Sequence, residues 1–297
     1  MVHAFSPASL PAPLPPGHRF PMIKYALLAE RLRHDGWAVE ASPMATDAEL
    51  ARAHDGAYLD AVERCALDAR AERRLGFPQS PELVRRSRAS VGGTVAAARW
   101  ALAHGLGVAL AGGTHHAFAD RGEGFCVYND LVVAARTLLD EGAVGRVLVV
   151  DLDVHQGNGT AAICAGDERV VTYSVHGARN YPFVKARSDL DVPLEDGADD
   201  RTYLAALERT LPPLFAANAF DLVLVQGGVD VLDGDRFGRM ALSEAGVVAR
   251  DRTVAELCRA AGTPVATTLG GGYHAEVERT VAAHAAGLTA MAAVLAA

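Results

Sequence analysis

The sequence predicts a single α/β domain built on a central, mainly parallel β-sheet flanked by helices. Short apolar segments of strand length alternate with helical segments from residue 108 onward, without internal repeats or a clear linker. Residues 147–150 form an apolar run dominated by β-branched side chains, which is typical of a strand buried on both faces. The length of 297 residues and the 50% hydrophobic content allow a sizeable core. We therefore expect one domain spanning residues 1–297.

The N-terminal part of the chain is expected to contain helices separated by loops. Residues 1–21 are rich in proline from residue 7 onward, so we expect an extended surface segment there. A turn at His54–Tyr58 is expected to lead into a helix that ends near Arg70, followed by a loop over Arg73–Pro81. The other helices predicted in this part, each followed closely by glycine, are Met22–His34 and Val84–His104.

The rest of the chain has a regular pattern. The predicted strands are Val108–Ala111, Val147–Val150, Val170–Val175, Leu222–Gln226 and Pro264–Leu269. The predicted helices are Asn129–Glu141, Asp199–Ala217, Ser243–Ala261 and one within the alanine-rich tail Thr280–Ala297. Ser243 is a favourable N-cap and Gly262 suits a helix end. Pro212 and Pro213 are expected to break their helix, because proline removes a helical hydrogen bond.

Polar side chains follow most of the predicted strands at the point where each strand ends. They are His115 and His116, Asp151, Asp153 and His155, Ser174 and His176, Asp230, and Tyr273. In parallel sheets, ligands bind at the carboxyl ends of the strands. Each group alone is weak evidence for a functional site, but their shared placement at strand ends predicts that they converge on one crevice.

These residue types suit metal-assisted hydrolysis. Asp153, His155 and Asp230 offer one nitrogen and two oxygen ligands, which with an open position describe a catalytic zinc site. The hydrolysis of an amide also needs a base for water, an acid for the leaving group and a donor for the oxyanion. His115 and His116 could supply the first two, and Tyr273 the third. Asp151 would orient a histidine.

Five segments carry a resemblance to a known family. In chain order they are Gly112–Ala117, Gly124–Asp130, Asp151–Gly159, Gly228–Arg236 and Leu269–Tyr273. Their order and spacing, from about residue 17 to the end, resemble the successive motifs of the zinc-dependent histone deacetylase family, in the arginase/deacetylase superfamily. The His155–Gly159 form (His-Gln-Gly-Asn-Gly) and the short chain are similar to its class IV-like bacterial branch.

The resemblance implies an arginase/deacetylase fold with an eight-stranded parallel sheet, and the hydrolysis of N-acetyl-lysine or a related acylated amine. It assigns zinc to Asp153, His155 and Asp230. It gives proton transfer to His116 and to His115 paired with Asp151, and carbonyl binding to Tyr273.

The resemblance also implies a substrate tunnel and a second cation. Gly124, Phe125 and Tyr181 would line the tunnel for the lysine stem. A structural monovalent cation, usually potassium, would use Asp151, Ser174 and main-chain oxygens of Asp153, His155 and Val175.

Asn158 departs from much of the family, in which class I members carry an aspartate partner for the second histidine. A neutral amide should stabilise the charged form of His116 less than a carboxylate would. We therefore expect His116 to act mainly as a base.

Three alternatives stay open at this stage. A manganese ureohydrolase of the same fold would need another aspartate two residues after the motif histidine, where Gly157 stands. A non-catalytic acyl-lysine or metal-binding module would be expected to have lost Tyr273 or the histidine pair. An acetylpolyamine deacetylase would use the same mechanism as a lysine deacylase.

Composition limits the partners and the compartment. The net charge of −8, from 28 basic and 36 acidic residues, disfavours nucleic-acid binding but suits a cationic product. The four cysteines are far apart and suggest reduced thiols in the cytoplasm. The tail is interrupted by His284 and Gly287, so we expect a packed helix rather than a membrane span. The expected partner is an acylated lysine or amine.

Overall fold

An eight-stranded, all-parallel sheet forms the centre of the computed structural model, which describes residues 2–295. The strand order is β2-β1-β3-β8-β7-β4-β5-β6. The strands are β1 His3–Ser6, β2 Ala38–Ala41, β3 Leu106–Ala109, β4 Val147–Asp151, β5 Val170–Gly177, β6 Leu190–Leu194, β7 Leu222–Gln226 and β8 Val265–Thr268. The predicted fold class is confirmed.

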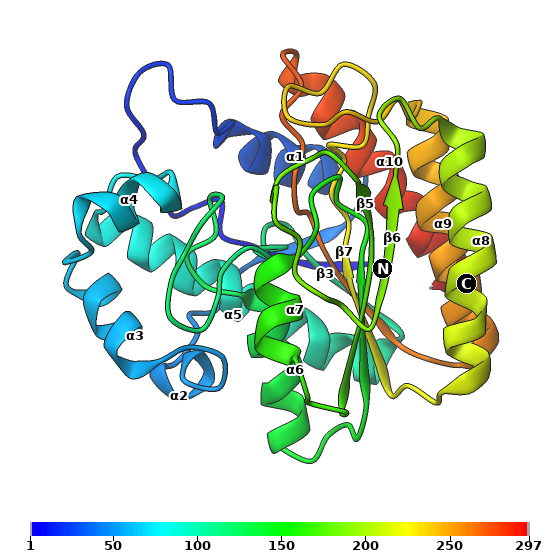
Figure 1. Ribbon diagram of the computed structural model, residues 1–297, viewed down its shortest axis with the longest axis horizontal. Helices are drawn as coiled ribbons and strands as arrows, with labels where there is room; N and C mark the ends of the chain where they lie inside the picture. Colours follow the sequence, from blue (N-terminus) through cyan, green and yellow to red (C-terminus); the bar gives the residue numbers. More distant parts are fainter. Residues whose placement is uncertain (1, 296–297) are drawn as a thin grey trace.

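Helices cover both faces of the sheet. They are α1 Ile23–His34, α2 Asp47–Leu50, α3 Gly56–Glu63, α4 Ala69–Leu75, α5 Pro81–His104, α6 Asp130–Asp140, α7 Asn158–Cys164, α8 Asp200–Ala217, α9 Glu244–Ala261 and α10 Val277–Leu295. In Figure 1, α8, α9 and α10 lie on one side of the central strands, and α5, α6 and α7 lie on the other. None of the helices in residues 2–295 has both the length and the apolar character needed to cross a bilayer.

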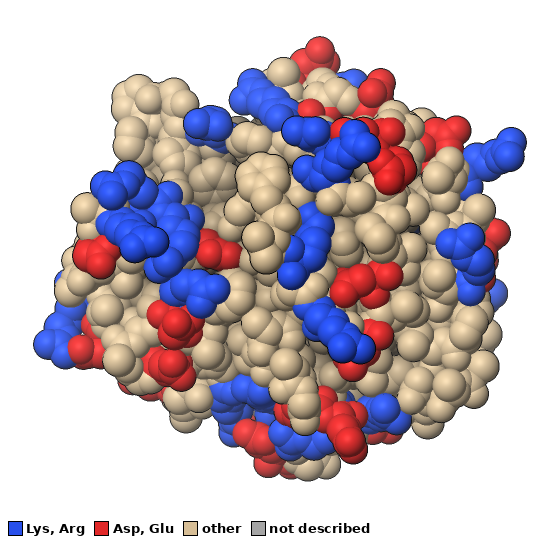
Figure 2. Space-filling model, in the orientation of Figure 1, with Lys and Arg blue, Asp and Glu red and all other residues tan. Residues whose placement is uncertain are grey.

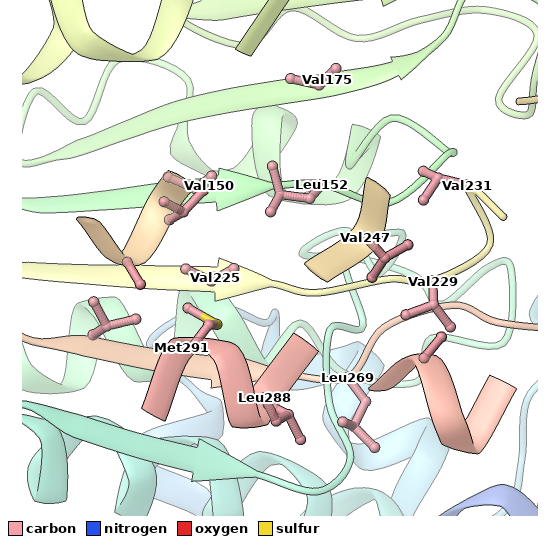
Figure 3. Close-up of a cluster of buried hydrophobic side chains, with 14 of the residues drawn as sticks. Val150, Leu152, Val175, Val225, Val229, Val231, Val247, Leu269, Leu288 and Met291 are labelled. Atoms are coloured by element: carbon pink, nitrogen blue, oxygen red, sulfur yellow. The ribbon is translucent and has the colours of Figure 1, made fainter. Parts of the chain in front are cut away.

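The two cores follow from the alternation of side chains along the buried strands. On β4, Val147 and Val149 pack into the core shared with α5 and α6, whereas Leu148 and Val150 pack into the core shared with α8, α9 and α10. Figure 3 shows the second core, in which Val150 and Met291 of α10 are drawn. Because both faces of β4 are buried, the strand is apolar until it ends at Asp151.

The structure corrects several expected elements. The segment 1–21 begins with a strand, β1, which lies between β2 and β3; residues 7–21 contain no helix or strand. The helix expected to reach Arg70 ends at Glu63, and α4 extends into the predicted loop up to Leu75. The strand expected at Val108–Ala111 is β3, two residues earlier. The strands β1, β2 and β6 were not predicted, because four or five residues of mixed polarity give little periodicity.

The expected break at Pro212 and Pro213 was wrong, since α8 is continuous through both. The two prolines fall in the last part of the helix and are not buried. The carbonyl groups that lose their helical partners there can bind water, so the helix persists.

Candidate active site

The end of β4 and the loop that follows it supply two of the three candidate metal ligands. Asp151 is the last residue of β4, and Asp153 and His155 lie just beyond it. The third candidate, Asp230, follows β7, which pairs directly with β4. The parallel pairing places Asp151 beside Gln226, so the two loops leave the sheet at the same edge.

Asp153, His155 and Asp230 converge on one point, and all three are buried. Their ligand atoms lie within 4.8 Å of one another. His155 Nδ1 is 2.9 Å from Asp153 Oδ1 and 3.1 Å from Asp230 Oδ2. One imidazole nitrogen and two carboxylate oxygens are a donor set that suits zinc with an open coordination position.

The remaining oxygens of the two carboxylates are fixed by hydrogen bonds. Asp153 Oδ2 accepts from Gln226 Nε2 at 2.7 Å and from the Gly271 amide at 2.8 Å, and Asp230 Oδ1 accepts from the Val154 amide at 3.0 Å. Burial, and then the charge of Asp153, raise the pKa of Asp230 to about 7. Two carboxylates this close and this deep need a compensating cation, so the site fits a divalent metal ion.

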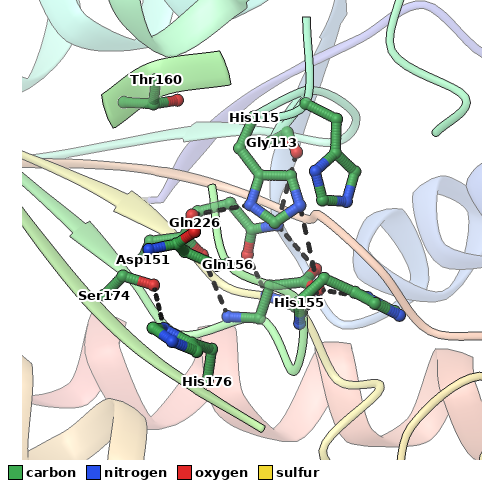
Figure 4. Close-up of polar contacts among 12 residues, drawn as sticks. Gly113, His115, Asp151, His155, Gln156, Thr160, Ser174, His176 and Gln226 are labelled. Atoms are coloured by element: carbon green, nitrogen blue, oxygen red, sulfur yellow. Dashed lines mark hydrogen bonds and ion pairs between the residues drawn. The ribbon is translucent and has the colours of Figure 1, made fainter. Parts of the chain in front are cut away.

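His115 is held by a carboxylate. Its Nδ1 lies 2.6 Å from Asp151 Oδ2, and both side chains are buried (Figure 4). Burial lowers the pKa of His115, but the charges of Asp151 and Asp153 outweigh burial and raise it to about 9. The turn before His115 is anchored by Asp130, whose carboxylate accepts from the amides of Gly113 and Thr114.

His116 is held by an amide that is itself fixed by a carboxylate. His116 Nδ1 lies 2.7 Å from Asn158 Oδ1, and Asn158 Nδ2 donates to Glu123 Oε1 at 2.8 Å. A carboxylate accepts only, so the Asn158 nitrogen faces Glu123 and its oxygen faces His116. His116 Nδ1 therefore carries the proton, which leaves Nε2 as an acceptor. Burial, and then the neighbouring His115 and His155, place the pKa of His116 well below its ordinary value.

Tyr273 lies on the glycine-rich loop that follows β8. Its amide donates to Asp235 Oδ2 at 2.6 Å, and Lys24 Nζ donates to the Gly270 carbonyl at 3.0 Å. A Cβ atom at Gly271 would lie 1.9 Å from Asp230 Oδ2, so only glycine lets this loop pass the metal site. Burial, and then the charges of Asp230 and Asp153, raise the pKa of Tyr273 well above its ordinary value, so the phenol keeps its proton.

A pocket of about 540 Å³ leads from the surface to these groups. His116, His155 and Tyr273 line its inner part, and the pocket is also lined by Gly124, Phe125, Tyr181 and Phe237. The Tyr181 ring lies edge-on to His116, with centroids 4.9 Å apart. A smaller inner cavity shares His116, Phe125 and Tyr273 and is also lined by His115 and Asp153. The predicted histidine, tyrosine and tunnel residues, with Asp153 and His155, therefore line the pocket or the inner cavity. Asp230 lines neither, but its Oδ2 lies 3.1 Å from His155 Nδ1.

The residues expected around a monovalent cation also lie close together. Asp151 and Ser174 are paired neighbours in β4 and β5, and Val175 follows in β5. The Ser174 hydroxyl is 2.9 Å from His176 Nδ1, and Asp151 Oδ1 accepts from the Asp153 amide at 3.2 Å. The potassium site stays a prediction.

Sequence reasoning missed several residues of this region: Glu123, Lys24, Gln226, Asp235 and Phe237. Gln226 is the last residue of the strand that precedes Asp230, and Asp235 lies in the same motif as Asp230. Their positions in the sequence could therefore have identified both as site residues. Glu123 and Lys24 reach the site from other loops and helices, and no local pattern marks them.

Comparison with known proteins identifies the family. The histone deacetylase domain model matches residues 17–288, so the chain belongs to the histone deacetylase family. It is therefore a hydrolase of this family, with an Asp-His-Asp site able to hold a metal ion. An uncharacterized protein of Picosynechococcus sp. is 44% identical over 92% of both chains. Histone deacetylase 2 of Arabidopsis thaliana is 31% identical over 89% of this chain and 72% of its own.

Two solved structures share the fold. The HDA15 HD domain has a TM-score of 0.81 at 23% identity, covering 98% of this chain and 90% of that one. Acetylpolyamine aminohydrolase from Burkholderia pseudomallei has a TM-score of 0.81 at 22% identity and covers 99% of both chains. At such identities the likeness shows the fold alone.

Proposed function

We propose that this protein is a zinc-dependent amidohydrolase that removes acetyl or longer acyl groups from lysine side chains or related amines. One observation carries the proposal: the three candidate metal ligands converge on one point, and two of them, together with the two histidines and Tyr273, line the pocket or its smaller inner cavity. The form of the Asp151–Gly159 motif favours the class IV-like branch of the family. Potassium held near Asp151, Ser174 and Val175, and a cytoplasmic location, belong to the same proposal.

The chemistry divides between the ion and the side chains. A zinc ion held by Asp153, His155 and Asp230 would polarise the substrate carbonyl and lower the pKa of water. His116, neutral and with Nε2 free, takes a proton from the attacking water. His115, whose charged form is stabilised by Asp151, returns a proton to the leaving amine. Tyr273 donates its hydroxyl proton in a hydrogen bond to the carbonyl oxygen. The products are a carboxylate and a free amine.

The geometry of the site also bears on the alternative functions. The two-metal ureohydrolase needs a carboxylate where Gly157 stands, and a Cβ at that position would lie 2.3 Å from Asp151 Oδ2. A binding module without catalysis gives no reason for two histidines each held by a hydrogen-bond partner. Acetylpolyamine hydrolysis uses the same site and differs only in the substrate.

The proposal is tested by measuring acetate release from a neutral acetyl-lysine peptide and from an acetylated polyamine. We expect the zinc-loaded protein to release acetate from the peptide, and protein stripped with a chelator to lose this activity. Release from the polyamine alone would assign the alternative substrate class. Zinc binding without turnover of either compound, or of a long-chain acyl-lysine peptide, would favour a binding module.

The pair of Asn158 and Glu123 predicts the pH dependence. Activity that needs neutral His116 is present above the pKa of His116 and is lost as the pH falls through it. In the double variant Asn158→Asp/Glu123→Gln, a carboxylate contacts His116 directly and raises its pKa, so the acidic limb of kcat/KM should move up by about 1 pH unit or more. Glu123→Gln alone removes a nearby negative charge and should move the limb slightly down. A pH–rate profile unchanged in both variants would contradict the role of His116 as base.

A further inference from the structure

The mouth of the pocket is positively charged. Arg19, Arg73 and Arg74 line it, and no aspartate or glutamate is among the residues that line this pocket. Arg73 and Arg74 lie in the last turn of α4, and Arg19 comes from the N-terminal segment. Figure 2 shows Lys and Arg side chains gathered over the α4 region. This local charge stands against a net charge of −8 for the whole chain.

The three arginines are free to meet a ligand. All three side chains are exposed, and within residues 2–295 none has a carboxylate within 4.0 Å, whereas Arg64, Arg88 and Arg99 each have one. The two acids nearest to Arg73 and Arg74 in the sequence have other partners. Asp68 caps α4 by accepting from the amides of Arg70 and Ala71, and Glu72 accepts from Gln79.

The position of the arginines indicates which part of a bound substrate they would contact. The aromatic side chains of Phe125, Tyr181 and Phe237 line the same pocket as His116 and Tyr273. An acylated lysine whose carbonyl reaches Tyr273 would place its apolar stem among these rings and its main chain and flanking residues at the mouth. A cleft lined by charges of one sign concentrates ligands of the opposite sign.

We propose that the mouth of the pocket selects acyl-lysine peptides that carry carboxylate side chains next to the acylated lysine. This proposal rests on the proposed function and specifies the class of substrate on which the site acts. A polyamine would bring its remaining ammonium groups to the same arginines and be repelled, so the mouth also opposes acetylpolyamines. The charge at this entrance is thus opposite in sign to the net charge of the whole chain.

The test compares three acetyl-lysine peptides of equal length, in which the flanking residues are glutamate, alanine or lysine. We expect kcat/KM to fall from the glutamate to the alanine to the lysine peptide, by about 3- to 10-fold at each step for exposed charge pairs. The preference should shrink as the salt concentration rises. Arg73→Ala/Arg74→Ala should remove most of the glutamate-to-lysine preference and leave the part due to Arg19, and Arg73→Glu/Arg74→Glu should invert the preference.

Arg70→Ala is the matched control. Arg70 is an exposed arginine of the same helix that does not line the pocket, so its removal should leave the ratio unchanged. No preference in the unaltered protein, or a preference that is undiminished in the double variant, would overturn the proposal.

The alanine peptide separates this proposal from the proposed function, because its turnover reports the chemistry without flanking charge. If no peptide is hydrolysed, calorimetry with the glutamate and lysine peptides still measures the selection. Tighter binding of the glutamate peptide, reduced in the double variant, supports the charged mouth even then. Equal binding of the two peptides rejects it.

Discussion

The variant Asp230→Asn should lose roughly 10³-fold or more of the deacylation rate, since a metal ion contributes several kcal/mol to stabilising the transition state. Asparagine keeps the oxygen that accepts from the Val154 amide, so the loop after β4 should stay in place. Asparagine also replaces the anionic oxygen that faces His155 with a neutral amide group, so one negative charge of the metal ligands is lost. Alanine at this position would also remove the buried acceptor of Val154, so its effect would mix catalysis with stability.

The measurement is acetate release together with the zinc retained per chain. Asp199→Asn is the matched control, because Asp199 is the exposed N-cap of α8 and asparagine caps helices about as well as aspartate. The control should keep both zinc and activity. An Asp230→Asn variant that hydrolyses acetyl-lysine peptide at the rate of the unaltered protein would exclude Asp230 as a ligand needed for turnover.

The variant Tyr273→Phe should lower kcat by about 10²- to 10³-fold and change KM little, because it removes a donor aimed at charge that develops only in the transition state. The phenyl ring would keep its contact with Phe237, whose ring centroid is 4.8 Å away, so the fold should be unaffected. Burial and two nearby carboxylates hold the pKa of Tyr273 well above its ordinary value, so the hydroxyl is protonated over the working pH range.

Tyr181→Phe provides the comparison for the same chemical change in the same pocket. The Tyr181 ring packs against His116, and phenylalanine keeps this packing. We expect its effect on kcat to be at least tenfold smaller than that of Tyr273→Phe. Equal effects of the two substitutions on kcat would mean that Tyr273 has no special role.

The parts of this site that the sequence predicts are those set by local geometry and by strand ends. Asp153 and His155 are two residues apart directly after a buried strand, so their spacing allows them to share one ion, and the polar groups at the other strand ends strengthen this interpretation. Asp230 is far away in the sequence, but the rule that ligands gather at the carboxyl ends of parallel strands predicts that it meets them. The pairing of β4 with β7 produces this meeting.

The parts that the sequence did not predict depend on contacts between distant segments. Glu123 accepts a hydrogen bond from Asn158, which lies in a different segment of the chain. No periodic sequence pattern links the two segments. The positive mouth arises because α4 and the segment containing Arg19 come together at one pocket, while the chain as a whole is acidic. Composition averages over the surface and cannot report such a local charge.

The most direct test of the account is to titrate zinc into metal-stripped protein while acetate release from a neutral acetyl-lysine peptide is followed. The convergence of Asp153, His155 and Asp230 predicts that the rate rises linearly and reaches its maximum at one zinc ion per chain. A rate that keeps rising up to two ions per chain would indicate a two-metal site. Full activity in the stripped protein would contradict a metal-dependent mechanism altogether.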